Sequence, residues 1–587
     1  MVKQLMKSIR EFKLATILTP TFVIGEVIIE ALIPFLISLL INDIKAGCDL
    51  SVILGYAWKL VALSLLSLLC GYLAGIYCAK ASTGFARNLR YDIFTNIQKF
   101  SFSNIDKFSS ASLVTRLTTD IQNVQMAFMM IIRTAVRAPL NLIFSFTMAY
   151  IMGGTMAVIF LIIIPFLGIG LYLIVRSVMP IFKKGFPLFD KITRIVEENV
   201  KGIRVVKSFV REDFEINKFD ETSNDIRKMF TRAEQIIALN NPLMQISIYA
   251  VMLFVLMFGS EMIIKTNATS LDVGQLSTLM TYGFQIMVSL MMLSMVFVMI
   301  TFSEESSKRI VEVLNEKSSI TSKENAITEV KDGSIDFDHV RFKYSPTAER
   351  PVLENIDVHI KSGETIGIIG GTGSAKSSFV QLIPRLYDVT EGTVRVGKED
   401  VRDYDLVTLR DSVAMVLQKN VLFSGTIADN IRWGNKDAIL EEVKHVCHLA
   451  CADEFIEQMP DGYDTWIEQG GTNVSGGQKQ RLCIARALLK QPKILIMDDS
   501  TSAVDTKTDA IIRKAMKEYI PETTKIIIAQ RTSSVEDADR IIVLDGGQID
   551  AIGTSEELLK TNQIYREVYL SQNKQGTEEI VEEGGVR

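Results

Sequence analysis

Six long apolar stretches in the first half of the chain restrict its possible folds more than any other feature. They cover roughly residues 14–42, 55–79, 130–152, 156–178, 240–264 and 273–302. Each exceeds the ~20 residues that a helix needs to cross a bilayer. We therefore predict an α-helical, multi-pass transmembrane domain over residues 1–305, with six spans in a lipid bilayer and both ends on one side.

Basic residues predict which side that is. The segment before residue 14 and the long connections 80–128 and 180–238 are rich in Lys and Arg, whereas the short loops 43–54 and 265–272 contain one Lys each. By the positive-inside rule, both termini lie in the cytoplasm, and we expect a bacterial-type cell (plasma) membrane. The first apolar run is too long for a cleavable signal peptide and is expected to remain as a span.

The two long connections are too long to be structureless loops. Each has helical periodicity and few prolines, so we expect helices that continue from the bilayer into the cytoplasm. Each connection should turn back through a short segment, near 101–108 and near 199–209. These turnarounds are natural contact points for a cytoplasmic domain.

Charged residues inside the spans are costly and therefore informative. Glu26 and Glu30 lie four residues apart and share one helix face. They could form a cation-attracting cavity wall, but an interhelical hydrogen bond or a place near a water-filled mouth is favoured. Arg133 and Arg137, near the start of the third span, are expected to extend to the membrane interface rather than to contact substrate.

Four methionines recur every four residues on the sixth span. They are Met287, Met291, Met295 and Met299. Flexible, polarizable side chains suit a surface that accepts varied apolar ligands. Ordinary helix packing explains the stripe equally well, so both interpretations stay open.

The second half of the chain has a different pattern. Residues 306–329 read as a charged helical linker, and from 330 to 572 strand and helix patterns alternate, which predicts an α/β domain. The tail 573–587 is acidic and is expected to be disordered. A net charge of only −5 gives no electrostatic argument for a nucleic-acid partner.

The first functional motif of this domain is a glycine-rich turn. It follows the apolar run Thr365–Ile369 and precedes a helical pattern, which is the context of a phosphate-binding loop. Inward-pointing N–H groups and the helix N-terminus would bind phosphates, Lys376 would reach the β- and γ-phosphates, and Ser377 would bind Mg²⁺. The predicted binding residues are Gly370, Thr372, Gly373, Ser374, Ala375, Lys376, Ser377 and Ser378.

Two further motifs complete this chemistry. The apolar run Lys493–Met497 ends in Asp498, which is placed to hold Mg²⁺, and Asp499, which is placed to orient an attacking water. Upstream, Ser475, Gly476, Gly477 and Gln478 open a helix and form a second phosphate-binding device. Because one nucleotide cannot easily meet both devices of one chain, we expect a head-to-tail pair of domains.

Together these motifs resemble the nucleotide-binding domain of ABC transporters. In chain order they are Gly370–Ser377, Gln418, Val474–Gln478, Ile494–Asp499, Ser502–Asp505 and Gln530. The fused spans with their long connections resemble the exporter (type IV) branch of the family. The resemblance implies a P-loop ATPase domain with a parallel sheet and a helical subdomain, ATP and Mg²⁺ as cofactors, and ATP hydrolysis coupled to transport.

The resemblance also implies roles for individual residues. Tyr344 would stack on adenine, and Gln418 would contact Mg²⁺ and the attacking water. Ser475–Gln478 would close on the γ-phosphate bound by a partner chain, and Asp505 would cross the dimer interface. The turnarounds 101–108 and 199–209 resemble the coupling helices that carry motion between domains.

Three departures from the family pattern fall in one site. Asp499 stands where the family has a catalytic Glu, Gln530 where it has a switch His, and Ala375 where it has Gly. A shorter carboxylate lies back from its water, Gln cannot carry a proton as His can, and Ala tolerates positive φ poorly. Asp499, Gln530 and Gln418 are the catalytic candidates of this degenerate site.

The resulting hypothesis is a half-transporter of a heterodimeric exporter. The chain would bind ATP at its own weakly hydrolytic site, and its intact Ser475–Gln478 segment would complete the competent site of a second, dissimilar half-transporter. The expected cargo is an amphipathic small molecule, as in multidrug efflux. Peptide or lipid export and a non-transporting, ATP-regulated membrane sensor remain alternatives.

Overall fold

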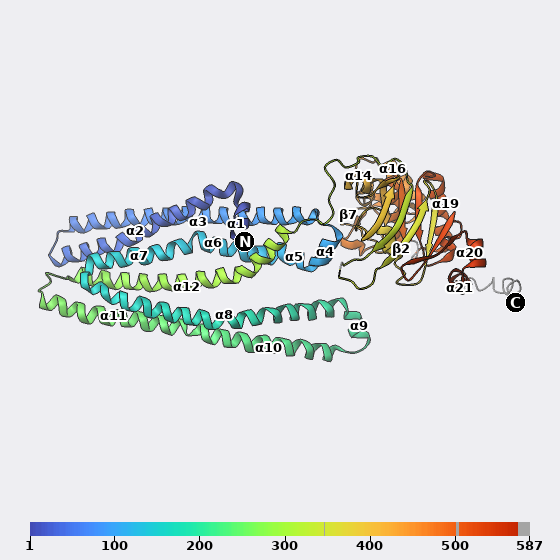
Figure 1. Ribbon diagram of the computed structural model, residues 1–587. Helices are drawn as coiled ribbons and strands as arrows, with labels where there is room; N and C mark the ends of the chain where they lie inside the picture. The colour runs from blue at the N-terminus through green and yellow to red at the C-terminus, as the bar shows by residue number, and fades with distance from the viewer. Residues whose placement is uncertain (346, 501–503, 573–587) are drawn as a thin grey trace. The chain divides into compact units, whose positions relative to one another are not determined.

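The computed structural model describes residues 1–345, 347–500 and 504–572 of the chain (Figure 1). The chain divides into two compact units. One contains Met1–Lys99 and Ser109–Glu316, and the other contains Phe100–Phe108 together with the chain from Lys317 onward. The second unit therefore combines the α/β domain with a short segment that the sequence inserts between two helices of the first.

The first unit is helical. Its elements are α1 (Val2–Leu5), η1 (Met6–Phe12), α2 (Lys13–Lys45), α3 (Leu50–Gln98), α5 (Ser110–Thr115), η2 (Arg116–Asp120), α6 (Ile121–Ile132), α7 (Thr134–Gly153), η3 (Gly154–Ala157), α8 (Val158–Lys201), α9 (Ile203–Ser208), α10 (Glu212–Ala238), α11 (Asn240–Lys265) and α12 (Val273–Asn315). Large apolar side chains are exposed along its longest helices, as expected of helices that face lipid.

The six predicted spans lie in five helical stretches that are long and apolar enough to cross a membrane. These are Val2–Lys45, Leu50–Gln98, Ser110–Lys201, Glu212–Lys265 and Val273–Asn315. Two spans share the third stretch because the turn between α7 and α8 is closed by the single 3-10 turn η3. Gly154 makes this reversal with a φ of 52°, which glycine adopts without strain. The predicted helical membrane domain is confirmed.

Both long connections turn back through a short helix. These are α4 (Phe102–Phe108) and α9, at the two predicted positions. The α4 segment belongs to the compact α/β unit, so its expected contact with that domain is confirmed. The α9 turnaround stays with the helical unit and leaves Phe209 and Val210 exposed. Its contact with a cytoplasmic domain stays a prediction.

The second unit contains three sheets. Its strands are β1 (Ile335–Phe342), β2 (Leu353–Ile360), β3 (Thr365–Ile369), β4 (Glu391–Val396), β5 (Glu399–Asp400), β6 (Val413–Val416), β7 (Gly425–Thr426), β8 (Trp466–Ile467), β9 (Ile494–Asp498), β10 (Thr524–Ile528), β11 (Arg540–Asp545) and β12 (Gln548–Gly553). They pair in the orders β2-β1-β4-β5, β12-β11-β3-β10-β9-β6 and β7-β8.

Helices cover and connect these sheets. They are α13 (Lys376–Gln381), α14 (Leu406–Ser412), α15 (Ile427–Arg432), α16 (Leu440–Leu449), α17 (Asp453–Ile456), η4 (Gly462–Asp464), η5 (Gln469–Gly471), α18 (Gly476–Leu489), α19 (Thr506–Tyr519), η6 (Thr532–Ser534), α20 (Ser555–Thr561) and α21 (Gln563–Gln572). Apolar residues of α15, α16, α17 and α18 form one core cluster, the helical subdomain.

The six-stranded sheet positions the site. Strands β6, β9, β10, β3 and β11 run parallel, so their carboxyl ends meet at one edge. All five residues of β9 and all five of β10 are buried, as expected of central parallel strands covered on both faces. Phe379 of α13 stacks on Phe337 of β1 at 4.2 Å and fixes the helix against the neighbouring antiparallel sheet. The predicted α/β domain is confirmed.

The predicted helical linker is wrong beyond Asn315. There α12 ends, and Glu316 is extended, with φ −65° and ψ 129°. The following segment bonds to the α/β unit: Ile327 N–H donates to the Asp403 carbonyl at 2.8 Å and its own carbonyl accepts from Asp405 N–H at 3.0 Å. Ser318, Ser319, Thr321 and Ser322 lie in this segment, and hydroxyl side chains compete with helical backbone bonds. The acidic tail 573–587 lies outside the described residues.

Candidate functional site

The turn after β3 is tightly curved. A side chain at Gly370 would place its Cβ 2.2 Å from the Leu544 carbonyl oxygen of β11, so only glycine fits there. Gly373 has a φ of 85° and Ala375 a φ of 69°, and α13 begins directly after Ala375. The backbone N–H groups of the turn therefore precede a helix N-terminus, which is the arrangement that binds phosphate. Ala375 carries the strain predicted for it.

Lys376 is held across the mouth of this turn. Its Nζ donates to the carbonyl oxygens of Gly370 and Gly371 at 2.7 and 2.9 Å and to Ser374 Oγ at 3.3 Å. Burial lowers the pKa of Lys376, and the negative charges of Asp498 and Asp499 act in the opposite direction. The ammonium group is therefore pre-positioned beside both acids, where it can bind an anion.

Two acids lie at the carboxyl end of β9. Asp498 is buried, burial raises its pKa, and a hydrogen bond from Ser377 opposes that shift. Asp499 follows in the left-handed region, with a φ of 48°, and its N–H donates to the Ile528 carbonyl of β10 at 3.0 Å. Hydroxyl and carboxylate oxygens are ligands that Mg²⁺ prefers, so Ser377 and Asp498 could together hold this ion.

Asp499 is bonded by the two other catalytic candidates. Gln530 Nε2, after β10, donates to Asp499 Oδ2 at 2.8 Å, and Gln418 Nε2, after β6, lies 3.5 Å from the same oxygen. Burial raises the pKa of Asp499, against the opposing effects of Gln418 and Lys376. The structure therefore brings together three side chains that the sequence places more than 30 residues apart.

These residues line one polar cleft of about 510 Å³. The lining consists of Val352, Ile369, all of Gly370–Ser378, Gln418, Asp498, Asp499, Ile528, Ala529, Gln530 and Val568. Val568 comes from α21, and Gln572 of the same helix donates to the Gln530 carbonyl at 2.8 Å and accepts from Thr532 N–H at 2.9 Å. Neither residue belongs to a sequence motif, so neither was predicted as part of the site.

Two other candidates lie outside this lining. The Tyr344 ring is half-exposed, and its hydroxyl shares a 2.8 Å hydrogen bond with Ser378 Oγ, beside the first turn of α13. Ser475 and Gln478 form a reciprocal capping box at the exposed start of α18, with Gln478 Oε1 accepting from Ser475 N–H at 2.9 Å. The exposed start of α18 is compatible with the predicted second phosphate-binding site, and that role stays a prediction.

The region after the acids is described only in part. Residues 501–503, which include the first two positions of the Ser502–Asp505 motif, lie outside the described residues. Asp505 caps the N-terminus of α19, with Oδ1 accepting from Thr508 N–H at 3.0 Å. Its predicted role at a dimer interface stays a prediction.

The charged residues of the membrane unit pair with one another. Arg137 of α7 donates to Glu26 at 2.8 Å and to Glu30 at 2.7 Å, both on α2. The favoured interhelical bonding of the two glutamates is thus confirmed. The pairing of Arg137 with both glutamates was not predicted, and it forms because two carboxylates one turn apart match the fork of a guanidinium group. Gly71 of α3 leaves room for Glu26, since a Cβ there would lie 2.8 Å from its Oε1.

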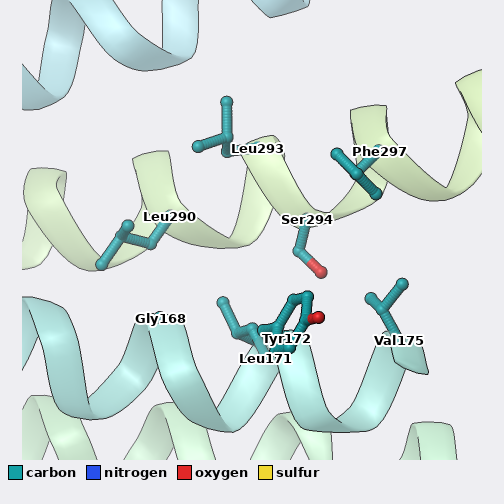
Figure 2. A pocket seen from close by; sticks show the side chains of 8 residues that line it. All are labelled: Gly168, Leu171, Tyr172, Val175, Leu290, Leu293, Ser294 and Phe297. Atoms are coloured by element: carbon teal, nitrogen blue, oxygen red, sulfur yellow. The ribbon is translucent and has the colours of Figure 1, made fainter. Parts of the chain in front are cut away.

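A small pocket lies between α8 and α12 (Figure 2). Its volume is about 160 Å³, and it is lined by Gly168, Leu171, Tyr172, Val175, Leu290, Leu293, Ser294 and Phe297. The lining is apolar apart from the hydroxyl groups of Tyr172 and Ser294. Of the methionine stripe on the same helix, Met287 is buried in the helix packing and Met295 is exposed. Packing therefore accounts for part of the stripe.

Comparison with known proteins decides the family. A family of ABC transporter transmembrane regions matches residues 16–291, and the ABC transporter family matches residues 353–502. The uncharacterized ABC transporter ATP-binding protein YfiB of Bacillus subtilis is 34% identical over 554 residues, covering 94% of this chain and 96% of YfiB. The chain belongs to the ABC transporter family. Its predicted membership and its class, an ATPase coupled to transmembrane transport, are thereby confirmed.

Two further likenesses bear on this ABC transporter. An ATP-dependent lipid A-core flippase of Photobacterium profundum is 30% identical over 521 residues, covering 86% of this chain and 88% of its own. The solved structure of a bacterial Atm1-family ABC exporter with ATP bound matches with a TM-score of 0.82 at 24% identity, covering 96% of this chain and 98% of that one. The second likeness shows that the transporter has the exporter fold.

The strain at Ala375 yields the first prediction. Ala375→Gly should stabilise the α/β unit of the transporter by about 0.5–1 kcal/mol, because relief of the left-handed strain exceeds the added chain entropy of glycine. Thermal unfolding of the purified chain measures the change. Gly373→Ala is the matched control: its position has a φ of 85° with open space around it, so it should destabilise by a similar amount. A lower Tm for Ala375→Gly would contradict the strain argument.

The buried Asp499 yields a pH-dependent prediction. Because its folded pKa is raised, stability is lost as the pH rises through that value. Asp499→Asn should therefore raise the Tm at pH 7.5, because the amide has no charge whose burial is costly. The gain should shrink as the pH is lowered toward about 4. Asp545→Asn, at an exposed carboxylate, is the control, and a gain that grows in acid would contradict the argument.

Proposed function

We propose that this ABC transporter chain is the degenerate half of a heterodimeric exporter of amphipathic small molecules. Its own cleft binds ATP with Mg²⁺ and hydrolyses it slowly, and its Ser475–Gln478 segment completes the competent site of a dissimilar partner. The observation that carries the proposal is that the side-chain amides of two glutamines hydrogen-bond the Asp499 carboxylate. Gln530 and Gln418 both donate to the oxygen that would orient the attacking water.

The identities of residues 499 and 530 are expected to slow hydrolysis for two reasons. The carboxylate of Asp499 is one methylene shorter than that of a glutamate, and a misplacement of ~1 Å can cost ~10²-fold in rate. A glutamine at position 530 can hydrogen-bond a γ-phosphate but cannot transfer a proton. Binding is affected less, because the phosphate turn, Lys376 and Asp498 are all in place around the cleft.

The proposal of a partner chain rests on the predicted phosphate-binding site at Ser475–Gln478. The first turn of α18 is exposed at Ser475 and Gly476, and the N–H groups of Gly476 and Gly477 take no part in the capping box of Ser475 and Gln478. Gln480 of the same helix donates to the Asp499 carbonyl at 3.3 Å, so α18 is tied to the acid of its own cleft. A nucleotide held by a second chain could approach this turn, and a motion there would reach both sites.

The cargo is inferred from the membrane unit. The pocket between α8 and α12 offers apolar walls with two hydroxyl groups, which suits an amphipathic molecule (Figure 2). Glu26 and Glu30 share one arginine, so their attraction for a cation is weakened. Lipid export is the second candidate, supported by the 30% identity to a lipid A-core flippase.

ATP turnover tests the proposed asymmetry. The purified chain alone should hydrolyse ATP slowly. In complex with its partner, Asp499→Glu combined with Gln530→His should raise turnover, because the longer carboxylate and the imidazole restore the missing groups. Single variants at the same positions serve as controls. Brisk hydrolysis by the wild-type chain alone, abolished by Asp499→Asn, would overturn the proposal.

Vesicle transport tests the cargo. Ser294→Trp should fill the pocket between α8 and α12 and reduce the ATP-dependent flux of a fluorescent amphipathic compound at least severalfold, since an indole takes up much of the space. Ser277→Trp, at an exposed position of the same helix, is the matched control and should retain flux. If a fluorescent phospholipid is moved instead, and the small compound is not, lipid export is the function.

A further inference from the structure

Tyr387, which belongs to no sequence motif, contacts both Tyr344 and the helix α4 within the second unit. The Tyr387 ring, in the segment between α13 and β4, lies perpendicular to the Tyr344 ring at 5.0 Å and 6.0 Å from the Phe102 ring of α4. Its hydroxyl donates to Asp106 Oδ2, also on α4, at 2.8 Å. Tyr387 therefore contacts the predicted adenine-stacking residue on one side and the first turnaround on the other.

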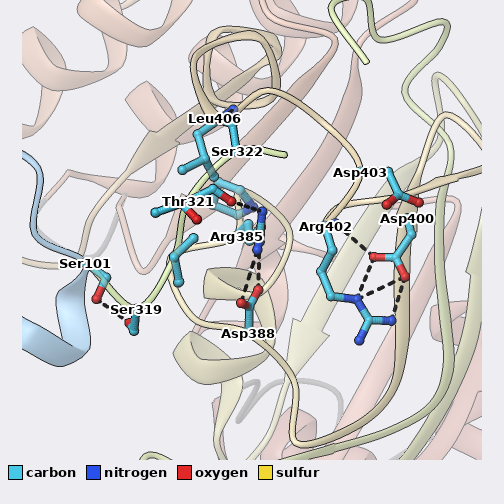
Figure 3. Close-up of polar contacts among 12 residues, drawn as sticks. Ser101, Ser319, Thr321, Ser322, Arg385, Asp388, Asp400, Arg402, Asp403 and Leu406 are labelled. Atoms are coloured by element: carbon cyan, nitrogen blue, oxygen red, sulfur yellow. Dashed lines mark hydrogen bonds and ion pairs between the residues drawn. The ribbon is translucent and has the colours of Figure 1, made fainter. Parts of the chain in front are cut away.

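The turnaround is in turn tied to the linker that leaves α12. Ser101 Oγ and Ser319 Oγ share a 2.7 Å hydrogen bond (Figure 3). Asn104 Oδ1 accepts from Ser319 N–H at 3.2 Å, and Asn104 Nδ2 donates to the Lys317 carbonyl at 3.2 Å. Any displacement of α4 therefore reaches the linker, which is covalently joined to the sixth span.

The segment that carries Tyr387 is itself rigid. Arg385, buried and with a φ of 51°, donates twice to the Asp388 carboxylate, at 2.7 and 3.2 Å, and once to the Thr321 carbonyl at 3.3 Å (Figure 3). Arg410 donates to the Arg385 carbonyl at 3.0 Å. The residues that flank Tyr387 are therefore held in place, so a displacement of Tyr344 or of α4 would act on the Tyr387 side chain.

At the other end, the contacts reach the phosphate turn. The Tyr344 hydroxyl and Ser378 Oγ form a 2.8 Å hydrogen bond, one residue after the predicted Mg²⁺ ligand Ser377. The contacts thus run without a gap from α13 through Tyr344 and Tyr387 to Asp106 and Phe102. Edge-to-face rings of this kind have a preferred geometry, so a shift of one ring favours a shift of the next.

We propose that Tyr387 is a positioning residue that transmits nucleotide binding at Tyr344 to the α4 turnaround. The inference rests on the proposed binding of ATP in this cleft, with the base against Tyr344. Its ring follows the movement of Tyr344, and its hydroxyl passes that movement to Asp106. Burial and the neighbouring Asp106 carboxylate raise the pKa of Tyr387, so the hydroxyl remains a proton donor over the physiological pH range.

Hydrogen–deuterium exchange on the full chain in lipid nanodiscs tests this role. Addition of ATP and Mg²⁺ should slow amide exchange in residues 102–108 of the wild-type protein. Tyr387→Phe keeps the ring contacts but loses the bond to Asp106, so it should bind ATP within about twofold of wild type while losing most of that protection. Asp106→Asn keeps an acceptor oxygen and should retain the response, whereas Asp106→Ala should lose it.

Two measurements distinguish a failure of the proposed role of Tyr387 from a failure of the proposed base contact at Tyr344. Equal ATP-induced protection of 102–108 in wild type and Tyr387→Phe would overturn the role of Tyr387. Tyr344→Ala should raise the Kd for ATP about tenfold through the loss of base stacking. An unchanged Kd would overturn the proposed base contact, and with it the relay, whatever the exchange data show. A loss of protection in Tyr387→Phe with near-normal ATP affinity is the result expected of a positioning role and not of a misfolded domain.

Discussion

Two sharp reversals of the backbone, at the ends of β3 and β9, control the geometry of the nucleotide cleft. Each places a residue other than glycine in the left-handed region: Ala375 with a φ of 69° and Asp499 with a φ of 48°. Such conformations persist only where the surroundings enforce them. Here the parallel sheet does so, since Asp499 N–H extends the ladder to β10 and Gly370 is pressed against β11. The convergence of the polar groups follows from that sheet.

The same reversal limits what Asp499 can do. Its backbone N–H is bonded to β10, so the reach of its carboxylate depends on the length of the side chain, and both glutamines approach the same oxygen, Oδ2. The departures from the family pattern at positions 499 and 530 are therefore one structural feature, because the two residues contact each other. A change at either position alone would leave the other residue in a geometry suited to its present neighbour.

Much of this architecture could be predicted from the sequence, because its strongest signals are local. Apolar length predicts the spans, and the residue order from β3 to α13 predicts the phosphate turn. What failed depended on distant partners: Arg137 meets Glu26 across more than 100 residues, and the linker bonds to the loop around Asp403. The contributions of α21 to the cleft and of Tyr387 to α4 were also not predicted. Contacts between distant elements cannot be inferred from the spacing of residues along the sequence.

Two of the three points where the chain passes between its compact units are joined to each other. Within the helical unit, Asn96 near the end of α3 donates to the carbonyls of Val313 and Glu316 at the end of α12, at 2.7 and 3.0 Å. Within the other unit, the continuations of the same two helices meet through Ser101 and Ser319. The ends of α3 and α12 and their continuations are thus bonded to each other in both units. The α9 turnaround has no such bond among the described contacts, and its apolar side chains Phe209 and Val210 are exposed.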